Sequence, residues 1–323
     1  MSIPIDNKKL RFLAHMGARG CLGEAVFSLA DEIDFHVCSA DLGIASGFQR
    51  FMEKYPERFI NTGIAEQNMI GIAAGIASSD YPVLATSWGA FSSYRCADQI
   101  RNYLGIMKSN VKIIGMDSGV TISRFGGCHY TIGDIALLRA IPNLMIISPC
   151  DGIEIYQAIE TALKVKGPVY VRLTGGQQLP LIHREADYIF KPKKAELLKE
   201  GEDVAVIGTG VILEQCIKAV KTLEKEGISC TLINISTLKP FDIEVLLGLV
   251  NHKIIVTVEE HNVLGGLGSA VAELLMGMHN RPKQIMLGIS DIIPSTGTYE
   301  YILEECGLLG SQIAERIIDE MGV

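Results

Sequence analysis

Residues 59–77 read FINTGIAEQNMIGIAAGIA. Asn61 or Thr62 has a side chain suited to starting a helix, and the helix body that follows is almost entirely small and apolar. Two glycines four residues apart allow close packing on one helix face. The stretch therefore predicts a buried helix with a single carboxylate, Glu66, at its head.

Short apolar runs alternate with amphipathic segments on both sides of this helix. The first series has expected strands at 35–42, 81–88, 110–117, 144–151 and 167–173, with helices at 20–33, 65–79 and 151–165. The second series has expected strands at 203–210, 229–236 and 253–260, with helices at 212–227, 242–251 and 268–278. Repeated strand and helix segments predict parallel sheets that are covered on both faces.

The predicted fold class is α/β, with two successive three-layer domains whose sheets are mostly parallel. Residues 1–180 form the first domain, 181–200 a linker, and 201–323 the second domain. In the linker, prolines and mixed charge replace the periodic pattern, so we expect an irregular or edge strand there.

Composition argues against several classes of function. A net charge of −8 and a pI near 5.5 provide no basic stripe for nucleic acid or an anionic membrane. The eight cysteines are scattered and the seven histidines show no metal-binding spacing, so no metal site is expected on this chain. The start of the sequence lacks the apolar region of a signal peptide, which favours a reduced, cytoplasmic location.

Several residues carry candidate chemistry. Glu66 at the head of a buried helix fits a tuned acid, or a carboxylate stabilised by the helix N-terminus and its polar neighbours. Trp88, Phe91 and Tyr94 recur every third residue, which fits one wall of a flat pocket or an ordinary core cluster. His129 is a lone loop histidine, a type that is more often exposed and inert.

The sequence resembles the transketolase family. GIAEQNMIGIAAGIA at 63–77 resembles the signature of that family's pyrimidine-binding domain, and residues 117–151 resemble its substrate-binding loop with the following helix and strand. VTVEEHNVLGGLGSAV at 256–271 resembles a block of the family's C-terminal domain. The resemblance covers essentially the whole chain and implies a pyrimidine-binding domain followed by a transketolase C-terminal domain.

The resemblance implies thiamine diphosphate as the cofactor. Glu66 takes the position of the glutamate that shares a proton with a ring nitrogen of the cofactor's aminopyrimidine. Phe91 takes the position that stacks on this ring, and the positions of Trp88 and Tyr94 line the same pocket.

Two further segments complete the implied site. CSADLG at 38–43 resembles the strand and turn against the cofactor, which places Asp41 and Leu42 near it. His129 takes the place of a histidine close to the reacting carbonyl of the substrate, where it would stabilise an alkoxide or pass a proton.

The substrate side departs from the family's pattern. Asp117 stands where a histidine usually begins the loop, and Arg124 and Phe125 replace a Glu-Asp pair. Residues 128–130 read Cys-His-Tyr instead of the customary Thr-His-Gln. These changes remove directional contacts to a sugar phosphate, so we expect an unusual acceptor.

The family often has a phosphate-binding arginine near the end of the first domain. Gly175 lies at about that position, which leaves Arg19 and Arg172 as expected anion contacts for the substrate.

The Gly-Asp-Gly motif that holds Mg²⁺ and the diphosphate in this family does not occur in the sequence. The resemblance therefore implies a separate N-terminal subunit that carries the Mg²⁺ ligands, in an α2β2 assembly with active sites between subunits. The favoured activity is transfer of a two-carbon ketol unit from a ketose to an aldehyde. A thiamine-dependent 2-oxo acid synthase or dehydrogenase beta subunit, and a non-catalytic partner subunit, remain alternatives.

Overall fold

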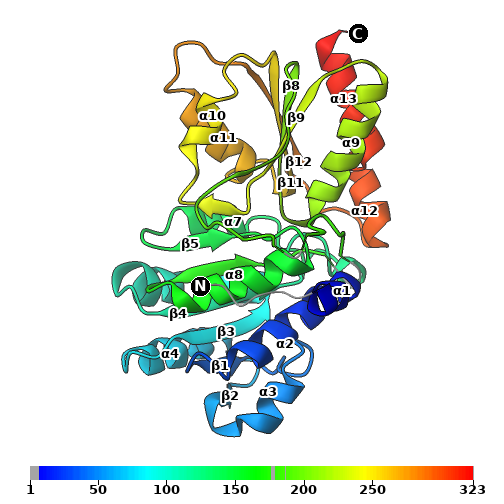
Figure 1. Cartoon of the computed structure of the whole chain (residues 1–323). Coiled ribbons are helices and arrows are strands. Elements are labelled where there is room, and N and C mark those ends of the chain that lie inside the picture. Colours follow the sequence, from blue (N-terminus) through cyan, green and yellow to red (C-terminus); the bar gives the residue numbers. More distant parts are fainter. Residues whose placement is uncertain (1–6, 176–178, 186, 323) are drawn as a thin grey trace.

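The first sheet contains seven strands in the order β10-β5-β6-β4-β3-β1-β2 (Figure 1). The computed structural model describes residues 7–175, 179–185 and 187–322. All neighbouring strands are parallel except the β10–β5 pair. Their bounds are β1 His36–Ser39, β2 Phe59–Asn61, β3 Val83–Trp88, β4 Val111–Met116, β5 Met145–Ile147, β6 Val169–Arg172 and β10 Thr237–Lys239.

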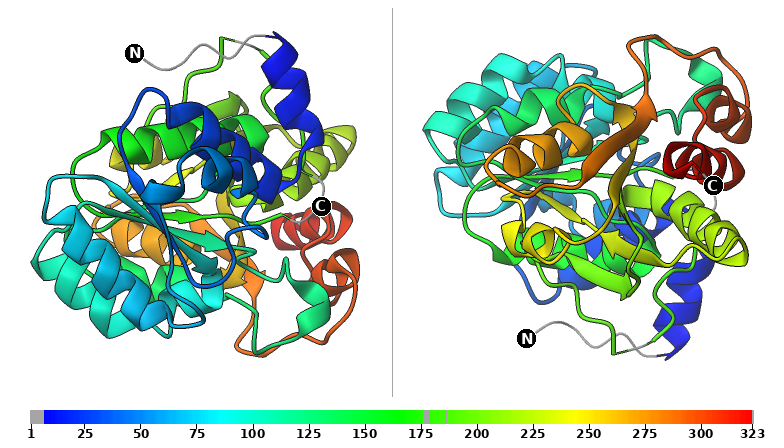
Figure 2. Two further views of the ribbon diagram at one scale, coloured as in Figure 1. Left: turned by 90° about the horizontal axis from the view of Figure 1, so that it is seen from below. Right: turned by 90° about the horizontal axis from the view of Figure 1, so that it is seen from above.

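Helices cover both faces of this sheet (Figure 2). Side chains alternate along the strands: Leu84 packs with α2 and α8, whereas Val83 and Ala85 pack with α4. The bounds are α1 Asn7–His15, α2 Ala18–Leu29, α3 Gln49–Lys54, α4 Glu66–Ala77, α5 Gly89–Ser93, α6 Ala97–Gln99, the π-helical η2 Ile100–Ile106, α7 Asp134–Arg139 and α8 Gly152–Lys164, with short 3-10 turns η1 Pro56–Arg58 and η3 Ser123–Phe125.

The second sheet has the order β12-β11-β8-β9-β7, and only β7 is antiparallel to its neighbour. Its strands are β7 Glu196–Lys199, β8 Val204–Thr209, β9 Cys230–Asn234, β11 Ile254–Asn262 and β12 Lys283–Ile289. The helices are α9 Leu213–Lys225, α10 Ile243–Leu247, α11 Leu267–Leu275, α12 Tyr299–Glu305 and α13 Gly310–Met321, after the 3-10 turn η4 Gly210–Ile212. The predicted fold class of two mostly parallel α/β domains is confirmed.

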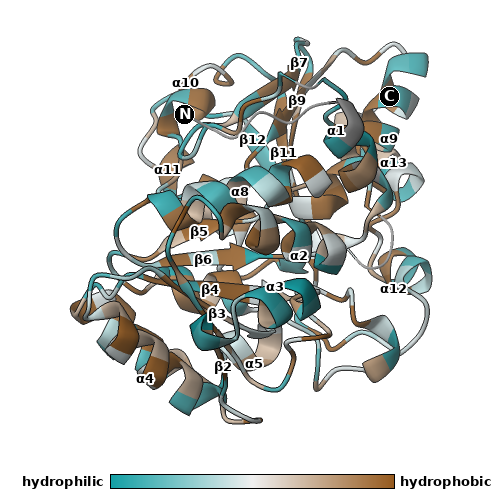
Figure 3. Ribbon diagram, turned by 60° about the horizontal axis from the view of Figure 1, so that its bottom comes forward, coloured by the Kyte–Doolittle hydropathy of each residue, from teal (hydrophilic) through white to brown (hydrophobic). Residues whose placement is uncertain are grey.

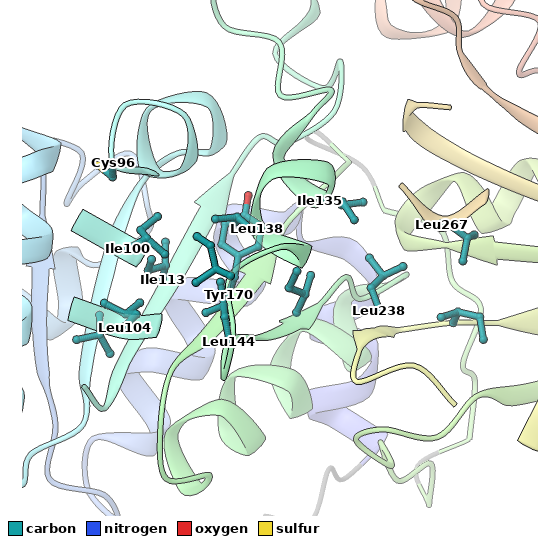
Figure 4. Close-up of a cluster of buried hydrophobic side chains, with 14 of the residues drawn as sticks. Cys96, Ile100, Leu104, Ile113, Ile135, Leu138, Leu144, Tyr170, Leu238 and Leu267 are labelled. Atoms are coloured by element: carbon teal, nitrogen blue, oxygen red, sulfur yellow. The ribbon is translucent and has the colours of Figure 1, made fainter. Parts of the chain in front are cut away.

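The two halves of the chain share one sheet and one core. Strand β10 comes from the second half, yet it pairs with β5, and the Ser148 amide donates to the Ser236 carbonyl at 2.7 Å. Leu238 and Leu267 join Ile135 in one cluster of buried side chains (Figure 4). The boundary between the two domains is therefore not a simple division of the chain at residue 201, because part of 201–323 completes the first sheet.

The expected linker contains one strand. β7 is an antiparallel edge strand of the second sheet, and residues 187–195 before it form no regular helix or strand. Ala186 of the linker lies outside the described residues. Among the described helices, none combines the length and apolar character needed to cross a bilayer.

The start of helix α4 differs from the sequence expectation. The helix begins at Glu66, and its N-cap residue, Ala65, provides no side-chain hydrogen bond. Asn61 instead closes the preceding turn, because its Oδ1 accepts the amide hydrogens of Asp41 at 3.1 Å and Gly63 at 3.0 Å. The prediction that Asn61 or Thr62 starts the helix was therefore wrong.

Only one face of α4 is buried. Met69 and Ile70 lie in the core, but among the described residues a Cβ added at Gly75 would meet nothing within 4 Å, and one added at Gly71 would meet only Tyr103, at 3.9 Å. In Figure 3, α4 lies at the edge of the molecule and carries hydrophobic residues along its length. Packing against the described residues does not require the two glycines.

Candidate functional site

Parallel topology gathers the candidate residues at one edge of the first sheet. Asp41 follows β1, Trp88 ends β3 and Asp117 follows β4, while Glu66 opens the helix after β2. The carboxyl ends of parallel strands meet at the same edge, where ligands bind in open α/β sheets. Residues far apart in sequence are thereby brought to one place.

Glu66 is held by one side chain from β3 and one from the segment that follows it. Its side chain is 2% exposed. Ser87 Oγ donates to Oε1 at 3.0 Å, and Arg95 Nη1 donates to Oε2 at 2.5 Å. The neighbouring Gln67 donates instead to the carbonyl of Arg95 at 2.9 Å, so it does not stabilise the carboxylate. The buried charge is compensated by a specific cation and a hydroxyl.

Four rings form a continuous aromatic cluster beside this carboxylate. The centroid of the His129 ring lies 5.0 Å from Trp88, 5.3 Å from Phe91 and 5.2 Å from Phe125. Trp88 also contacts Phe91 at 5.9 Å and Phe125 at 5.8 Å. His129 is therefore packed against apolar rings, with Nδ1 3.1 Å from Cys128 Sγ.

Tyr94 does not form part of this cluster. Its hydroxyl accepts the amide hydrogen of Gly133, and its ring lines a separate cavity with Asn262 and Ile293 from the second half of the chain. The expectation that Trp88, Phe91 and Tyr94 line one pocket is corrected, because the helical turn α5 directs Tyr94 toward the junction between the domains.

Asp41 and Leu42 form a tight turn after β1. Asp41 has a positive φ of 60°, and its Oδ1 accepts from Asn61 Nδ2 at 3.0 Å. The Leu42 amide donates to Ser39 Oγ at 3.1 Å. These hydrogen bonds hold the turn rigidly. Both side chains nevertheless remain accessible, so each still has surface available to a ligand.

A cavity of about 730 Å³ lies beside the loop that follows β4. It is lined by Arg19, Asp117, Arg124 and Phe125 from the first domain and by Tyr299 from the second. Arg19 forms an ion pair with Asp117, which is 5% exposed, whereas Arg124 is exposed. The structure thus brings four of the predicted substrate residues together at one cavity.

The second domain fixes the position of this loop. Glu260 Oε1 accepts the Val120 amide hydrogen at 2.7 Å, and Tyr299 donates to Glu260 Oε2 at 2.6 Å. The Tyr130 hydroxyl lies 2.8 Å from the Ser123 carbonyl. Burial raises the pKa of Glu260, an effect that these hydrogen bonds oppose.

Arg172 is not available to a substrate. The residue is 0% exposed, and its Nε donates to Asp134 Oδ2 at 2.9 Å. Its Nη2 donates to the carbonyls of Thr131 at 3.0 Å and Glu260 at 2.9 Å. The expected anion contact is therefore corrected, because Arg172 uses its donors to join the two domains.

Gly175 leaves little space for a side chain. Its φ is +80°, and an added Cβ would lie 2.7 Å from Leu179 Cδ2 and 2.8 Å from Val211 Cγ2. A side chain at this position would need both a strained backbone and displaced neighbours. The local fold therefore disfavours at Gly175 the phosphate-binding arginine that the resemblance implied near this position.

Sequence reasoning missed Ser87 and Arg95, the two partners of Glu66. Both flank the aromatic run that was recognised, but a serine at the end of a strand and an arginine beyond a helical turn carry no distinctive spacing. A search for a compensating cation near the buried acid would have included Arg95.

Family models match both domains. The model for the transketolase pyrimidine-binding domain matches residues 15–177, and that for the transketolase C-terminal domain matches residues 193–313. The chain belongs to the transketolase family and corresponds to its C-terminal section.

Relatives and a solved structure agree with this assignment. A protein of Methanocaldococcus jannaschii described as a transketolase C-terminal section is 37% identical, over 95% of this chain and 97% of its own. The 6-deoxy-6-sulfo-D-fructose transketolase subunit SqwH of Clostridium sp. is 36% identical, over 85% and 84%. A structure titled split gene transketolase, inactive beta4 tetramer, has a TM-score of 0.83 at 33% identity, covering 93% of this chain and 96% of that one.

The residues present fit the aminopyrimidine end of thiamine diphosphate, which the family implies. A buried carboxylate, Glu66, and an aromatic ring, Phe91, both contact Arg95, so the site offers the two partners that a flat ring with a basic nitrogen requires. The buried Nε1 of Trp88 also has no hydrogen-bond partner among the described residues, which leaves a donor for a ligand or a second chain.

Proposed function

We propose that this chain is the subunit of a split, thiamine-diphosphate-dependent transketolase that binds the aminopyrimidine and part of the substrate. When bound, the cofactor supplies the nucleophilic carbon that accepts a two-carbon ketol unit from a ketose. The observation that carries the proposal is the buried Glu66 beside Phe91, at the sheet edge next to the substrate-side cavity.

Each side chain has a defined task in this proposal. Glu66 exchanges a proton with the aminopyrimidine, and Ser87 fixes the orientation of the carboxylate. Phe91 provides the stacking surface, with Trp88 behind it. His129, held among three aromatic rings, donates a proton or hydrogen bond to the carbonyl oxygen of the substrate.

A separate N-terminal subunit is proposed to supply the Mg²⁺ ligands and the diphosphate site, in an α2β2 assembly in the cytoplasm. The exposed Gly75 and the half-buried Gly71 of α4 support this partner, because a helix face with little packing against the described residues is suited to close contact with another chain. The relative whose title names an inactive beta4 tetramer is consistent with a chain that needs a second type of subunit.

The substrate is proposed to differ from an ordinary phosphorylated aldose. Arg124 and Phe125 lie at the cavity, Arg19 is paired with Asp117, and Gly175 excludes an arginine. The relative SqwH is named for a sulfonated ketose, so an anionic group other than phosphate fits this chemistry. Steady-state kinetics with ribose 5-phosphate as acceptor test the idea, since efficient turnover that saturates at low concentration would refute it.

Reconstitution tests the proposed activity. The purified chain and its candidate N-terminal subunit should each be inactive, and mixing them with Mg²⁺ and thiamine diphosphate should restore ketol transfer. Full activity of the chain alone would contradict the partner requirement. Release of labelled carbon dioxide from pyruvate without ketol transfer would instead identify a 2-oxo acid enzyme.

A further inference from the structure

One side chain, Arg95, contacts both groups that the proposed function assigns to the aminopyrimidine. Its Nη1 lies 2.5 Å from Glu66 Oε2, and its Cζ lies 4.2 Å from the centroid of the Phe91 ring. The guanidinium is planar and cationic, so it both stacks on the ring and donates to the carboxylate. These are the two contacts expected of a stacked ring with a protonated nitrogen.

The two groups cannot occupy this position together. A ring stacked on the same side of Phe91 and within hydrogen-bonding distance of Glu66 Oε2 would overlap the guanidinium of Arg95. Arg95 must therefore leave before such a ring binds there.

The structure leaves a path for this movement. The Arg95 side chain is 41% exposed, whereas Glu66 is 2% exposed, so the arginine has a path toward solvent and the carboxylate does not. The Arg95 carbonyl is held by Gln67 Nε2 at 2.9 Å, which fixes the backbone while the side chain turns. Without a cation, the buried carboxylate would carry an uncompensated charge.

We propose that Arg95 is a placeholder for the aminopyrimidine: it pairs with Glu66 and orients its carboxylate in the unliganded subunit, and it is displaced when the cofactor binds. The proposal rests on the proposed function of Glu66 and Phe91. Arg95 is a positioning residue, and its removal from the site is part of the cost of cofactor binding.

The test compares thiamine diphosphate affinity in the reconstituted complex by titration calorimetry at saturating Mg²⁺. We take Arg95 to have left Glu66 in about a tenth of the unliganded wild-type complexes. The Arg95→Ala complex should then bind the cofactor about tenfold more tightly than the wild type. Arg95→Lys, which keeps the charge, should remain close to the wild type. Arg101→Ala, an arginine that is 58% exposed and pairs only with Asp98 at 3.5 Å among its described contacts, is the matched control.

The direction of the change separates the explanations. If the substitution damages the fold, or if Arg95 contacts the bound cofactor directly, the Arg95→Ala complex should bind thiamine diphosphate more weakly than the wild type. Weaker binding would overturn the placeholder role. In a Glu66→Gln background the effect of Arg95→Ala should shrink to less than about twofold, because the ion pair is already absent. Failure of the wild-type complex to bind thiamine diphosphate at all would reject the proposed function itself.

Discussion

Asp134 and Arg172 form an ion pair sealed between the two domains, with Oδ2 and Nε 2.9 Å apart and side chains 0% and 1% exposed. Tyr170 donates to the same Asp134 oxygen at 2.7 Å, and Arg172 reaches the carbonyls of Thr131 and Glu260. The pair connects β6, α7 and β11, so it joins the strand ends that support the site.

Removing one partner of this pair should destabilise the chain strongly. Arg172→Met leaves the Asp134 carboxylate buried without a cation, which should lower the free energy of unfolding by about 3–5 kcal/mol. Urea denaturation followed by circular dichroism measures the change. Arg316→Met, which removes a surface pair with Glu320, should cost no more than about 1 kcal/mol. Equal stability of the Arg172→Met variant and the wild type would show that the pair is not structural.

His183 should make stability depend on pH. Burial alone disfavours the imidazolium, but hydrogen bonds to Asp151 and Glu196, each at 2.9 Å, outweigh it and raise the pKa of His183 from 6.5 to about 10. Its stabilising contribution is therefore complete below pH 6.5, declines above it and is lost as the pH passes about 10.

Thermal melts of His183→Gln should show this dependence. The difference in melting temperature from the wild type should be largest below pH 6.5 and should shrink steadily toward pH 10. His279→Gln, at an exposed histidine, should leave the profile of the wild type unchanged. A difference that grows with pH would mean that His183 is neutral in the folded chain.

Cys128 should be the fastest-reacting thiol. It is exposed, whereas burial raises the pKa of Cys21, Cys38 and Cys96 to about 12. Titration with a chromogenic disulfide should show one rapid thiol in the folded chain, and Cys128→Ser should abolish that phase. Because Cys128 Sγ is 3.1 Å from His129 Nδ1, the modified complex should also lose ketol transfer. Persistence of the rapid phase in Cys128→Ser would assign it to another cysteine.

Gly75 should matter for assembly but not for folding. A Cβ added there meets nothing within 4 Å among the described residues, and leucine replaces a helical glycine, so the change should leave stability unchanged or raise it by up to about 1 kcal/mol. It should nevertheless weaken association with the N-terminal subunit, measured by sedimentation velocity. Lys221→Leu, an exposed change on α9, is the control. Undiminished assembly of Gly75→Leu would place the partner elsewhere.

The sequence predicted the alternating strands and helices well, because buried parallel strands such as β4 and β8 are continuous apolar runs. Among the strands, it missed β2, β10 and β12. For β10 no local pattern could suffice, because this strand pairs with β5 from the other half of the chain. Asn61 illustrates the same limit: its amide can cap a helix or close a turn, and only the position of Asp41 determines which occurs.

For the candidate site, the sequence predicted several of the residues but not the directions of all their side chains. The resemblance led to Glu66, Phe91 and His129, and the structure places them in a continuous group linked by Arg95. The resemblance could not show that Arg172 points into the domain junction or that Tyr94 leaves the aromatic cluster. Both outcomes depend on side-chain direction after the strands are assembled.

Turnover by the reconstituted complex carrying Glu66→Gln tests the central claim most directly. The amide keeps the shape of the carboxylate but cannot exchange a proton, so ketol transfer should fall by about 10²–10⁴-fold while the subunits still assemble. Activity within about threefold of the wild type, at equal cofactor occupancy, would contradict the assignment of Glu66 as the residue that activates the cofactor.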